Sequence, residues 1–187
     1  MLAPLPQRRI KPTPLTEAEY QEFKVALTIW RDTLIAMTLR NTGLRVSELL
    51  RLEVRDCQLD IDDPHILARR SKSRSDVDEY ERLWLNPLLA AALRAHLKEH
   101  RLRSGKVFPV TDRNVRYAFA RAGLRSIGRA VRPHELRGLF IRSCIDGGLR
   151  IESTADLVGH KDPRVTQRYY YATSQDLRRQ VGKIMPV

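Results

Sequence analysis

The sequence predicts a mainly α-helical fold with one small antiparallel β-sheet, an α+β architecture. Apolar residues recur at helical spacing over most of the chain and are flanked by helix-capping residues. Between about residues 58 and 85, short apolar runs alternate with polar residues, which is typical of strands. With 187 residues, of which 42% are hydrophobic, the chain can bury one ordinary core. We therefore expect one domain over residues 15–187, preceded by a basic, Pro-rich arm or linker over residues 1–14.

Capping residues mark the helices of the N-terminal part. Thr16 and Glu19 have the spacing of a capping box, and the apolar residues that follow at helical spacing extend to Trp30. Gly43 suits the C-terminal cap of a second helix. The helices predicted here begin at residue 16 and then cover about residues 33–42 and 46–52.

The central sheet is predicted to be followed by helices to the end of the chain. The basic segment 70–76 falls at the tip of a hairpin within the sheet. Pro133 and Pro163 both suit first helical positions, where the missing N–H is not needed. The helices predicted after the sheet cover about residues 87–102, 112–122, 133–146, 152–158, 163–171 and 174–184.

The charge of the chain points to a polyanionic partner. The formal net charge is +12, and 27 of the 34 basic residues are Arg, whose fork matches phosphate geometry. No apolar run approaches the roughly 20 residues that span a bilayer. Cys57 and Cys144 are too few for a disulfide framework or a zinc cluster, which favours a reducing cytoplasm.

Short motifs carry the chemistry. Residues 42–49 read Thr-Gly-Leu-Arg-Val-Ser-Glu-Leu, and His134 precedes Arg137 by one helical turn. His160 follows His134 after 26 residues, and Tyr169 follows His160 after 9. Arg forks can hold a phosphate without a metal, and a phenol can capture it covalently. This set of residues favours phosphodiester cleavage.

Together these motifs resemble the catalytic domain of the tyrosine recombinases, the phage integrase family, from about Leu15 to about Gln180. The resemblance implies that domain's fold and a site-specific recombinase or integrase activity. Such enzymes cleave and rejoin DNA through a 3′-phosphotyrosyl intermediate and need neither a metal, a cofactor nor ATP. It also implies double-stranded DNA as partner, a tetramer on DNA, and a monomer in its absence.

The resemblance selects Tyr169 as the nucleophile, with Tyr170 and Tyr171 as neighbouring competitors. Successive helical residues point about 100° apart, so that one of the three faces the site. A free phenol has a pKa near about 10, and it therefore needs a base and positive charge close by.

The other catalytic roles also follow from the resemblance. Arg45 and Arg137 would clamp the phosphate, and His160 would donate a third hydrogen bond to it. His134 would lie near the phenol and accept its proton, and Glu48 would orient the clamp. Taken singly, each of these residues has an ordinary structural interpretation, but their order and spacing favour the catalytic one.

A general acid must protonate the leaving 5′-oxygen. Family members use a Lys on the hairpin of the small sheet, and Lys72 is the one Lys between Lys24 and Lys98. This segment lacks the family's usual glycines. The chain also departs from the family at Gly138, where a second His often follows the Arg, and this hints at looser packing there.

A basic series begins in the predicted helix over 112–122, in the region that contacts the DNA duplex in the family. A solvated Arg face is an equally good interpretation. The residues of the series are Arg113, Arg116, Arg121, Arg125, Arg129 and Arg132. The first three are the candidate DNA-binding residues.

Other functions stay open. A non-catalytic DNA-binding regulator would explain the charge but not the ordered motifs, and a type IB topoisomerase would space them differently. His96 and His100 fit a zinc peptidase pattern, H-x-x-E-H. No third ligand follows, so we predict a solvated helix surface and no metal site. A cytoplasmic, nucleoid-associated location without membrane partners follows from these expectations.

The resemblance covers a catalytic domain alone. Most family members carry an additional N-terminal helical domain that closes around DNA, whereas about 15 residues precede Thr16 here. We expect either a minimal recombinase or the catalytic fragment of a longer chain. The basic, Pro-rich start resembles an interdomain linker and favours the fragment slightly.

Overall fold

The computed structural model describes residues 14–69, 80–160 and 163–167. Its elements follow one another in the order α1, α2, α3, a 3₁₀ turn η1, three strands and five further helices. Their bounds are α1 Glu17–Val25, α2 Trp30–Thr42, α3 Val46–Leu49, η1 Val54–Asp56, β1 Cys57–Gln58, β2 His65–Arg69, β3 Tyr80–Trp84, α4 Pro87–Glu99, α5 Asp112–Ser126, α6 Pro133–Asp146, α7 Ile151–Val158 and α8 Pro163–Gln167. The predicted fold class, helices with one small antiparallel sheet, is confirmed.

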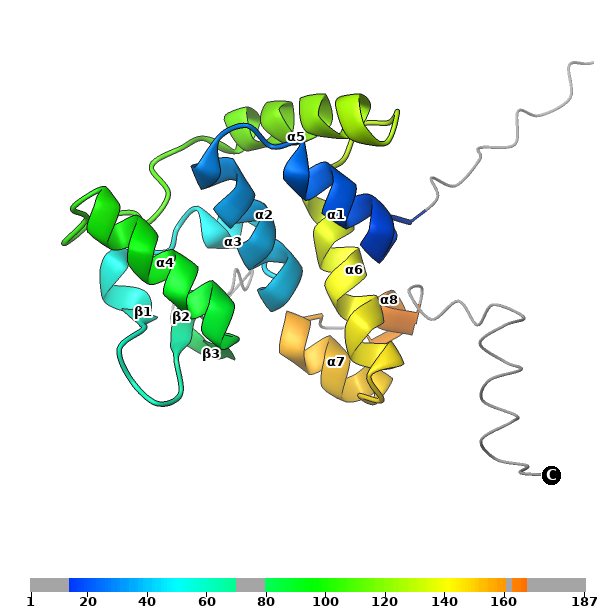
Figure 1. The fold of residues 1–187 in the computed structure, drawn as a ribbon. Helices are drawn as coiled ribbons and strands as arrows, with labels where there is room; N and C mark the ends of the chain where they lie inside the picture. The colour runs from blue at the N-terminus through cyan, green and yellow to red at the C-terminus, as the bar shows by residue number, and fades with distance from the viewer. Residues whose placement is uncertain (1–13, 70–79, 161–162, 168–187) are drawn as a thin grey trace, which may run out of the picture.

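Helix α2 is the centre of the molecule (Figure 1). It contacts α1, α3, α4, α5 and α6, and most of its side chains are buried. Helix α5 crosses one end of this assembly, and α6 runs from α5 towards α7 and α8 (Figure 1). The large buried side chains Phe23, Phe108 and Phe119 join these helices into one core. Because α2 is packed on so many sides, the loop that follows it is held firmly in place.

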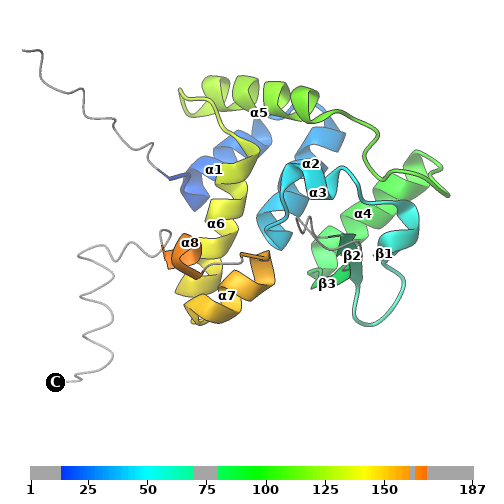
Figure 2. The same cartoon turned by 180° about the vertical axis from the view of Figure 1, so that it is seen from behind.

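The sheet lies beside α4, on the side of the molecule away from α6 (Figures 1 and 2). Strand β2 pairs with β1 and β3, and both pairings are antiparallel. Ile66 and Leu83 are cross-strand partners that enter the core, whereas Arg69 pairs with Tyr80 at the edge where the hairpin leaves the sheet. The predicted hairpin tip, 70–76, lies outside the described residues.

Several predicted caps are present. The Thr16 hydroxyl and the Glu19 carboxylate form the reciprocal capping box at the start of α1. Gly43 ends α2 in the left-handed region with φ 64°, and a Cβ there would collide with the ring of Phe140. Pro133 begins α6 as predicted, and α6 covers residues 133–146.

Some helix ends differ from the prediction for identifiable reasons. Trp30 begins α2 and is 47% exposed, so it does not belong to the apolar face of α1. Helix α3 ends at Leu49, since the amides of Arg51 and Leu52 bond three residues back, to the carbonyls of Glu48 and Leu49. Helix α4 stops at Glu99, since Arg101 adopts the left-handed φ of 51°.

Helix α5 runs four residues further than the predicted end at 122. Gly123 does not break it, because a bare Cα is needed there. A Cβ would lie 2.5 Å from the carbonyl oxygen of Arg129 and 2.7 Å from the amide of Val131. Within the described ranges, no helix is long and apolar enough to cross a membrane.

Candidate active site

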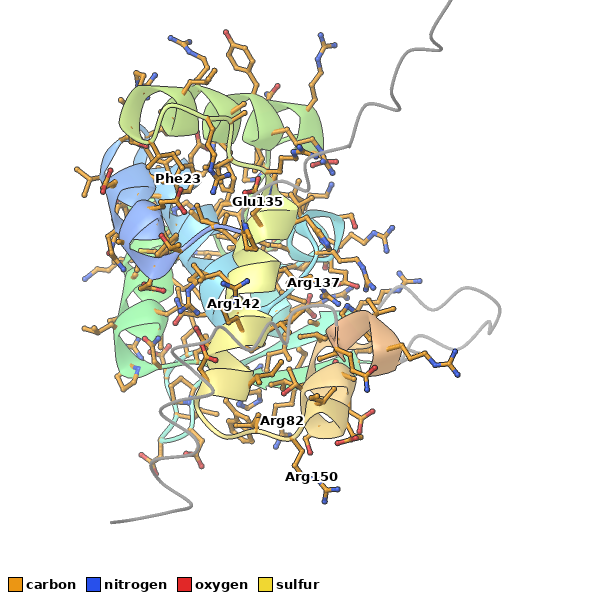
Figure 3. The ribbon with its side chains drawn as sticks, turned by 90° about the vertical axis from the view of Figure 1, so that its right-hand side faces the viewer. Phe23, Arg82, Glu135, Arg137, Arg142 and Arg150 are labelled. Atoms are coloured by element: carbon orange, nitrogen blue, oxygen red, sulfur yellow. The ribbon has the colours of Figure 1, made fainter. Side chains whose placement is uncertain are left out.

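Arg137 is the most deeply buried cation of the structure's described part, with 1% of its surface exposed. It lies on α6 and points towards the middle of the molecule (Figure 3). Its Nη1 donates to the carbonyl of Gly43 at 2.5 Å, and its Nη2 donates to the carbonyl of Val158 at 2.6 Å. One guanidinium thus ties the loop before α3 to the end of α7, and it holds two of the sequence motifs together.

Arg45 and Glu48 form the second part of the cluster. Arg45 caps α3, and the Glu48 carboxylate accepts from the Arg45 backbone N–H and from its Nη1, both at 2.8 Å. The Glu48 side chain has no exposed surface, whereas 41% of the Arg45 side chain is exposed. A buried carboxylate therefore fixes the base of a guanidinium whose other side reaches solvent. The orienting role of Glu48 in catalysis stays a prediction.

His134 lies one turn before Arg137 on α6 and is exposed at the surface. Partial burial lowers the pKa of His134 below its ordinary value, and the charges of Arg137 and Arg45 lower it further, against the opposing effect of Glu135. The two Arg residues are therefore close enough to act on this ring. A histidine held neutral in this way is able to accept a proton.

His160 follows Gly159, which ends α7 in the left-handed region with φ 66°. The His160 backbone N–H donates to the carbonyl of Ala155 at 2.8 Å, and this bond completes the helix cap. Its ring Nδ1 lies 2.8 Å from the hydroxyl of Thr166, a fully buried residue of α8. The Thr166 hydroxyl thus orients the ring.

The structure brings five of the predicted site residues, Arg45, Glu48, His134, Arg137 and His160, together from three segments. Arg137 links the segments of Arg45 and His160, and His134 shares the helix of Arg137. Lys72, predicted as the general acid, lies outside the described residues. Tyr169 and its competitors Tyr170 and Tyr171 do so as well.

The sequence did not single out the carbonyls of Gly43 and Val158 as partners of Arg137. The first of these carbonyls belongs to a left-handed glycine, Gly43, and the second is followed directly by another, Gly159. Helix C-caps of this kind leave backbone carbonyls for other donors. The glycines of the two motifs are therefore the sequence signal for carbonyls that can accept hydrogen bonds from a distant side chain.

The candidate DNA-binding residues Arg113, Arg116 and Arg121 are exposed on α5. The Arg116 Nε pairs with the Asp112 carboxylate at 2.9 Å, and Arg121 lies over the ring of Tyr117, 5.5 Å from its centroid. A face of Arg and aromatic side chains suits contact with a nucleic acid backbone.

The remaining arginines of the basic series divide between structural and exposed positions. Arg129 bridges Glu19 of α1 and Glu135 of α6, at 3.4 and 2.6 Å. Arg125 donates to the carbonyl of Ala26 at 2.8 Å, and Arg132 is exposed. Arg129 therefore stabilises the fold.

The zinc peptidase pattern does not form a metal site in the described part of the chain. No group of at least three potential metal ligands occurs there. His96 is 2% exposed, its Nε2 lies 3.1 Å from the carbonyl of Val107, and its ring packs against Phe108. The prediction of a wholly solvated surface was wrong for His96, because this residue faces the core.

This helical fold with its small sheet is that of a tyrosine recombinase catalytic domain. The crystal structure of XerA recombinase superimposes with a TM-score of 0.73 at 24% identity, over 98% of this chain and 68% of that one. The Tn1549 transposon integrase in complex with transposon right end DNA gives a TM-score of 0.74 at 18% identity, over 96% and 68%.

The chain belongs to the phage integrase family, whose sequence profile matches residues 14–176. Tyrosine recombinase XerC of Staphylococcus epidermidis is 29% identical over 153 residues, which are 80% of this chain and 52% of that protein. Tyrosine recombinase XerA of Saccharolobus solfataricus is 30% identical over 183 residues, 97% of this chain and 60% of that protein. The chain thus spans about half to three fifths of the length of these relatives.

Proposed function

We propose that this chain is the catalytic domain of a site-specific DNA recombinase or integrase. The observation that supports the proposal best is Arg137, because its two bonds hold the Arg45 and His160 segments around the end of α6. Each terminal nitrogen of that guanidinium carries a second N–H. Two Arg forks and the His160 ring would surround one phosphate, and they would stabilise its negative charge without a metal.

In the proposed reaction the Tyr169 phenol attacks the scissile phosphorus. The phenol proton passes to His134, whose lowered pKa leaves it neutral at pH 7. The bond to the 5′-oxygen breaks, and Lys72 protonates this leaving group. The products are a 3′-phosphotyrosyl enzyme and a free 5′-hydroxyl. Attack by a 5′-hydroxyl, from the same or a partner duplex, reverses the step and restores the phenol.

His160 and Glu48 would position the clamp. Since Thr166 engages Nδ1 of His160, the ring would meet the phosphate through Nε2. Glu48 would keep Arg45 at the phosphate through its 2.8 Å ion pair. Bond energy is retained in the phosphotyrosine, and we propose that the reaction requires neither ATP nor a divalent metal.

Double-stranded DNA is the proposed substrate, held also by the exposed face of α5. Two solved structures of similar fold hold such a substrate: the XerH site-specific recombinase bound to its palindromic difH substrate, and the Tn1549 transposon integrase in complex with transposon right end DNA. Their folds resemble this one, which favours DNA here. We further propose a tetramer assembled on DNA from subunits that are monomeric without it, acting in the cytoplasm at the nucleoid.

Covalent trapping tests the proposal. The protein is mixed in EDTA, without ATP, with nicked duplexes pooled from its genomic neighbourhood, and is then run on an SDS gel. We expect an SDS-stable protein–DNA band that is lost in Tyr169→Phe and kept in Tyr170→Phe and Tyr171→Phe. If the band is lost in Tyr170→Phe or Tyr171→Phe instead, the nucleophile is that tyrosine and not Tyr169. No band with any duplex, despite salt-sensitive binding, would favour a DNA-binding regulator.

A further inference from the structure

A pocket lined by charged side chains lies directly beside the candidate active site. It is a cavity of about 200 Å³ whose wall includes Glu48, the residue that holds Arg45. Its other walls come from the turn after α3, from η1 and from the outer face of β2 and β3. The pocket and the clamp thus share one carboxylate as their common wall.

Two cations of this pocket are not used by the fold. Arg51 and Lys106 are exposed, and across the described ranges their side chains have neither a hydrogen-bond nor an ion-pair partner. Arg69 and the half-exposed Tyr80, a cross-strand pair, complete the basic wall. Cations left without partners at the edge of a charged site are available to an anionic ligand.

The acidic side chains of the pocket have partners within the protein. The Glu48 carboxylate accepts from Arg45 at 2.8 Å. Glu53 pairs with Arg55 Nε at 2.9 Å, and the Asp56 carboxylate accepts from the backbone N–H of Glu53 at the same distance. Glu48 and Glu53 are paired with arginines and Asp56 with a backbone amide, whereas Arg51 and Lys106 are cations of the pocket without a side-chain partner in the described part of the chain.

The backbone holds these two cations in place. The amide of Val107 donates to the carbonyl of Leu52 at 3.0 Å, and the amide of Val54 donates to the carbonyl of Gly105 at 2.9 Å. Lys106 lies between these bonds, in a β-bridge with Glu53. The segment that carries Lys106 is therefore fastened to the segment that follows Arg51, and the pocket is preformed.

We propose that this pocket binds a second phosphate of the DNA strand whose scissile phosphate lies between Arg45 and Arg137. Hydrogen bonds of α3 and of the turn after it connect the carbonyl of Arg45 to the amide of Arg51. At the helical rise of about 1.5 Å per residue, the six steps from Arg45 to Arg51 span about 9 Å. At about 3.4 Å of rise per nucleotide, this corresponds to roughly two or three nucleotides along one strand. Arg51 and Lys106 would hold this phosphate, so that the strand passes the nucleophile in one register.

This inference rests on the proposed function for the position of the strand, but its first test does not require cleavage. Binding of a 30-bp random-sequence duplex is measured by fluorescence anisotropy against salt, for wild type and Arg51→Gln/Lys106→Gln. The slope of log K against log salt is negative, and loss of one phosphate contact makes it less steep by about 0.9. We expect that decrease, and an affinity lower by about tenfold near 0.1 M salt.

The matched control is Lys98→Gln/Arg103→Gln, which removes the same charge from exposed positions beside α4. We expect its salt slope to equal that of wild type. Equal decreases in both double variants would overturn the pocket, because bulk charge alone would then explain them. Circular dichroism and thermal unfolding check that both variants fold.

The second test uses the duplex that gives the covalent band, with single phosphates replaced by neutral methylphosphonates. We expect a neutral linkage two or three nucleotides from the cleaved phosphate to lower the DNA affinity of the wild-type protein about tenfold. The same linkage should not lower the DNA affinity of the Arg51→Gln/Lys106→Gln variant further. Additive losses at every position would overturn the inference and leave the recombinase function standing.

The remaining outcomes separate the two proposals. If the salt slope changes only in Arg51→Gln/Lys106→Gln and no duplex gives a covalent band, the phosphate pocket is supported and the proposed cleavage reaction is contradicted. Absence of salt-sensitive duplex binding in wild type would remove both.

Discussion

The guanidinium of Arg137 and the carbonyl of Gly43 lie 2.5 Å apart, although 94 residues separate them in the chain. Gly43 ends α2, and two residues later Arg45 begins α3. The bond therefore places the first motif arginine relative to the second. Because the same guanidinium also reaches Val158, an error in its position would move the His160 segment as well.

Replacing Arg137 should damage both folding and cleavage. In Arg137→Gln the carbonyls of Gly43 and Val158 lose a charged donor in a buried place. We expect the free energy of unfolding to fall by about 2–4 kcal/mol, and trapping to slow by at least about a hundredfold. Urea denaturation and the rate of covalent band formation measure the two effects.

The matched control is Arg142→Gln, which lies on the same helix (Figure 3). Arg142 is half-buried, and we expect its substitution to change stability by less than about 1 kcal/mol. Equal losses in the two variants would contradict a special role for Arg137.

Gly43 should tolerate no side chain. A Cβ there would collide with the Phe140 ring, and φ is 64°. We expect Gly43→Ala to lower the free energy of unfolding by about 2–3 kcal/mol. Phe140→Ala in the same chain relieves the collision but not the backbone strain. The double variant should therefore lose less than the two single losses added together, as a double-mutant cycle by urea denaturation would reveal. Additive losses would mean that the ring and the glycine do not interact.

The fold was largely predictable because its signals are local. The capping box of Thr16, the glycine cap at Gly43 and the proline at the start of α6 are decided by neighbouring residues. The end of α4 was missed, because it depends on the left-handed conformation of Arg101, a residue type that rarely adopts it. The length of α5 was missed because Gly123 serves a long-range contact with the 129–131 segment.

The residues of the site were predictable from the sequence, but the hydrogen bonds that connect them were not. Motif spacing singled out Arg45, Arg137 and His160, and the structure gathers them. The bonds of Arg137 to carbonyls 94 and 21 residues away follow only from tertiary packing. The pocket of Arg51 and Lys106 is also non-local, since a β-bridge between Glu53 and Lys106 joins distant segments in its wall.

The Thr166 hydroxyl should affect cleavage through His160. Thr166→Val keeps the shape of a buried side chain but removes the group that lies 2.8 Å from Nδ1. Loss of about 1 kcal/mol of orienting interaction corresponds to roughly a five- to tenfold slower trapping rate. Thr166→Ser retains a hydroxyl and should keep most of the rate. If both variants trapped DNA at the wild-type rate, His160 would not need this partner.

Stability should fall as the pH drops below about 6.5, because two histidines resist protonation in the folded state. Burial lowers the pKa of His96, with the charges of His100 and Arg31 adding to the effect. Partial burial and the charges of Arg137 and Arg45 lower the pKa of His134. At a pH below the ordinary histidine pKa, the unfolded chain binds more protons than the folded chain does. The free energy of unfolding therefore rises with pH across this window and levels off above it.

Urea denaturation at several pH values between 5 and 8 measures this slope, and His134→Gln should reduce it while leaving the contribution of His96. Glu17 and Glu19 fall outside the window. Partial burial raises the pKa of each carboxyl, but hydrogen bonds outweigh it, chiefly from Arg40 to Glu17 and from Thr16 to Glu19. Their pKa values thus lie below the ordinary carboxyl value of 4.5, and their stabilisation disappears only as the pH falls below that value. A wild-type stability that is flat from pH 8 to 5 would contradict the lowered histidine pKa values, and with them the neutral base proposed at His134.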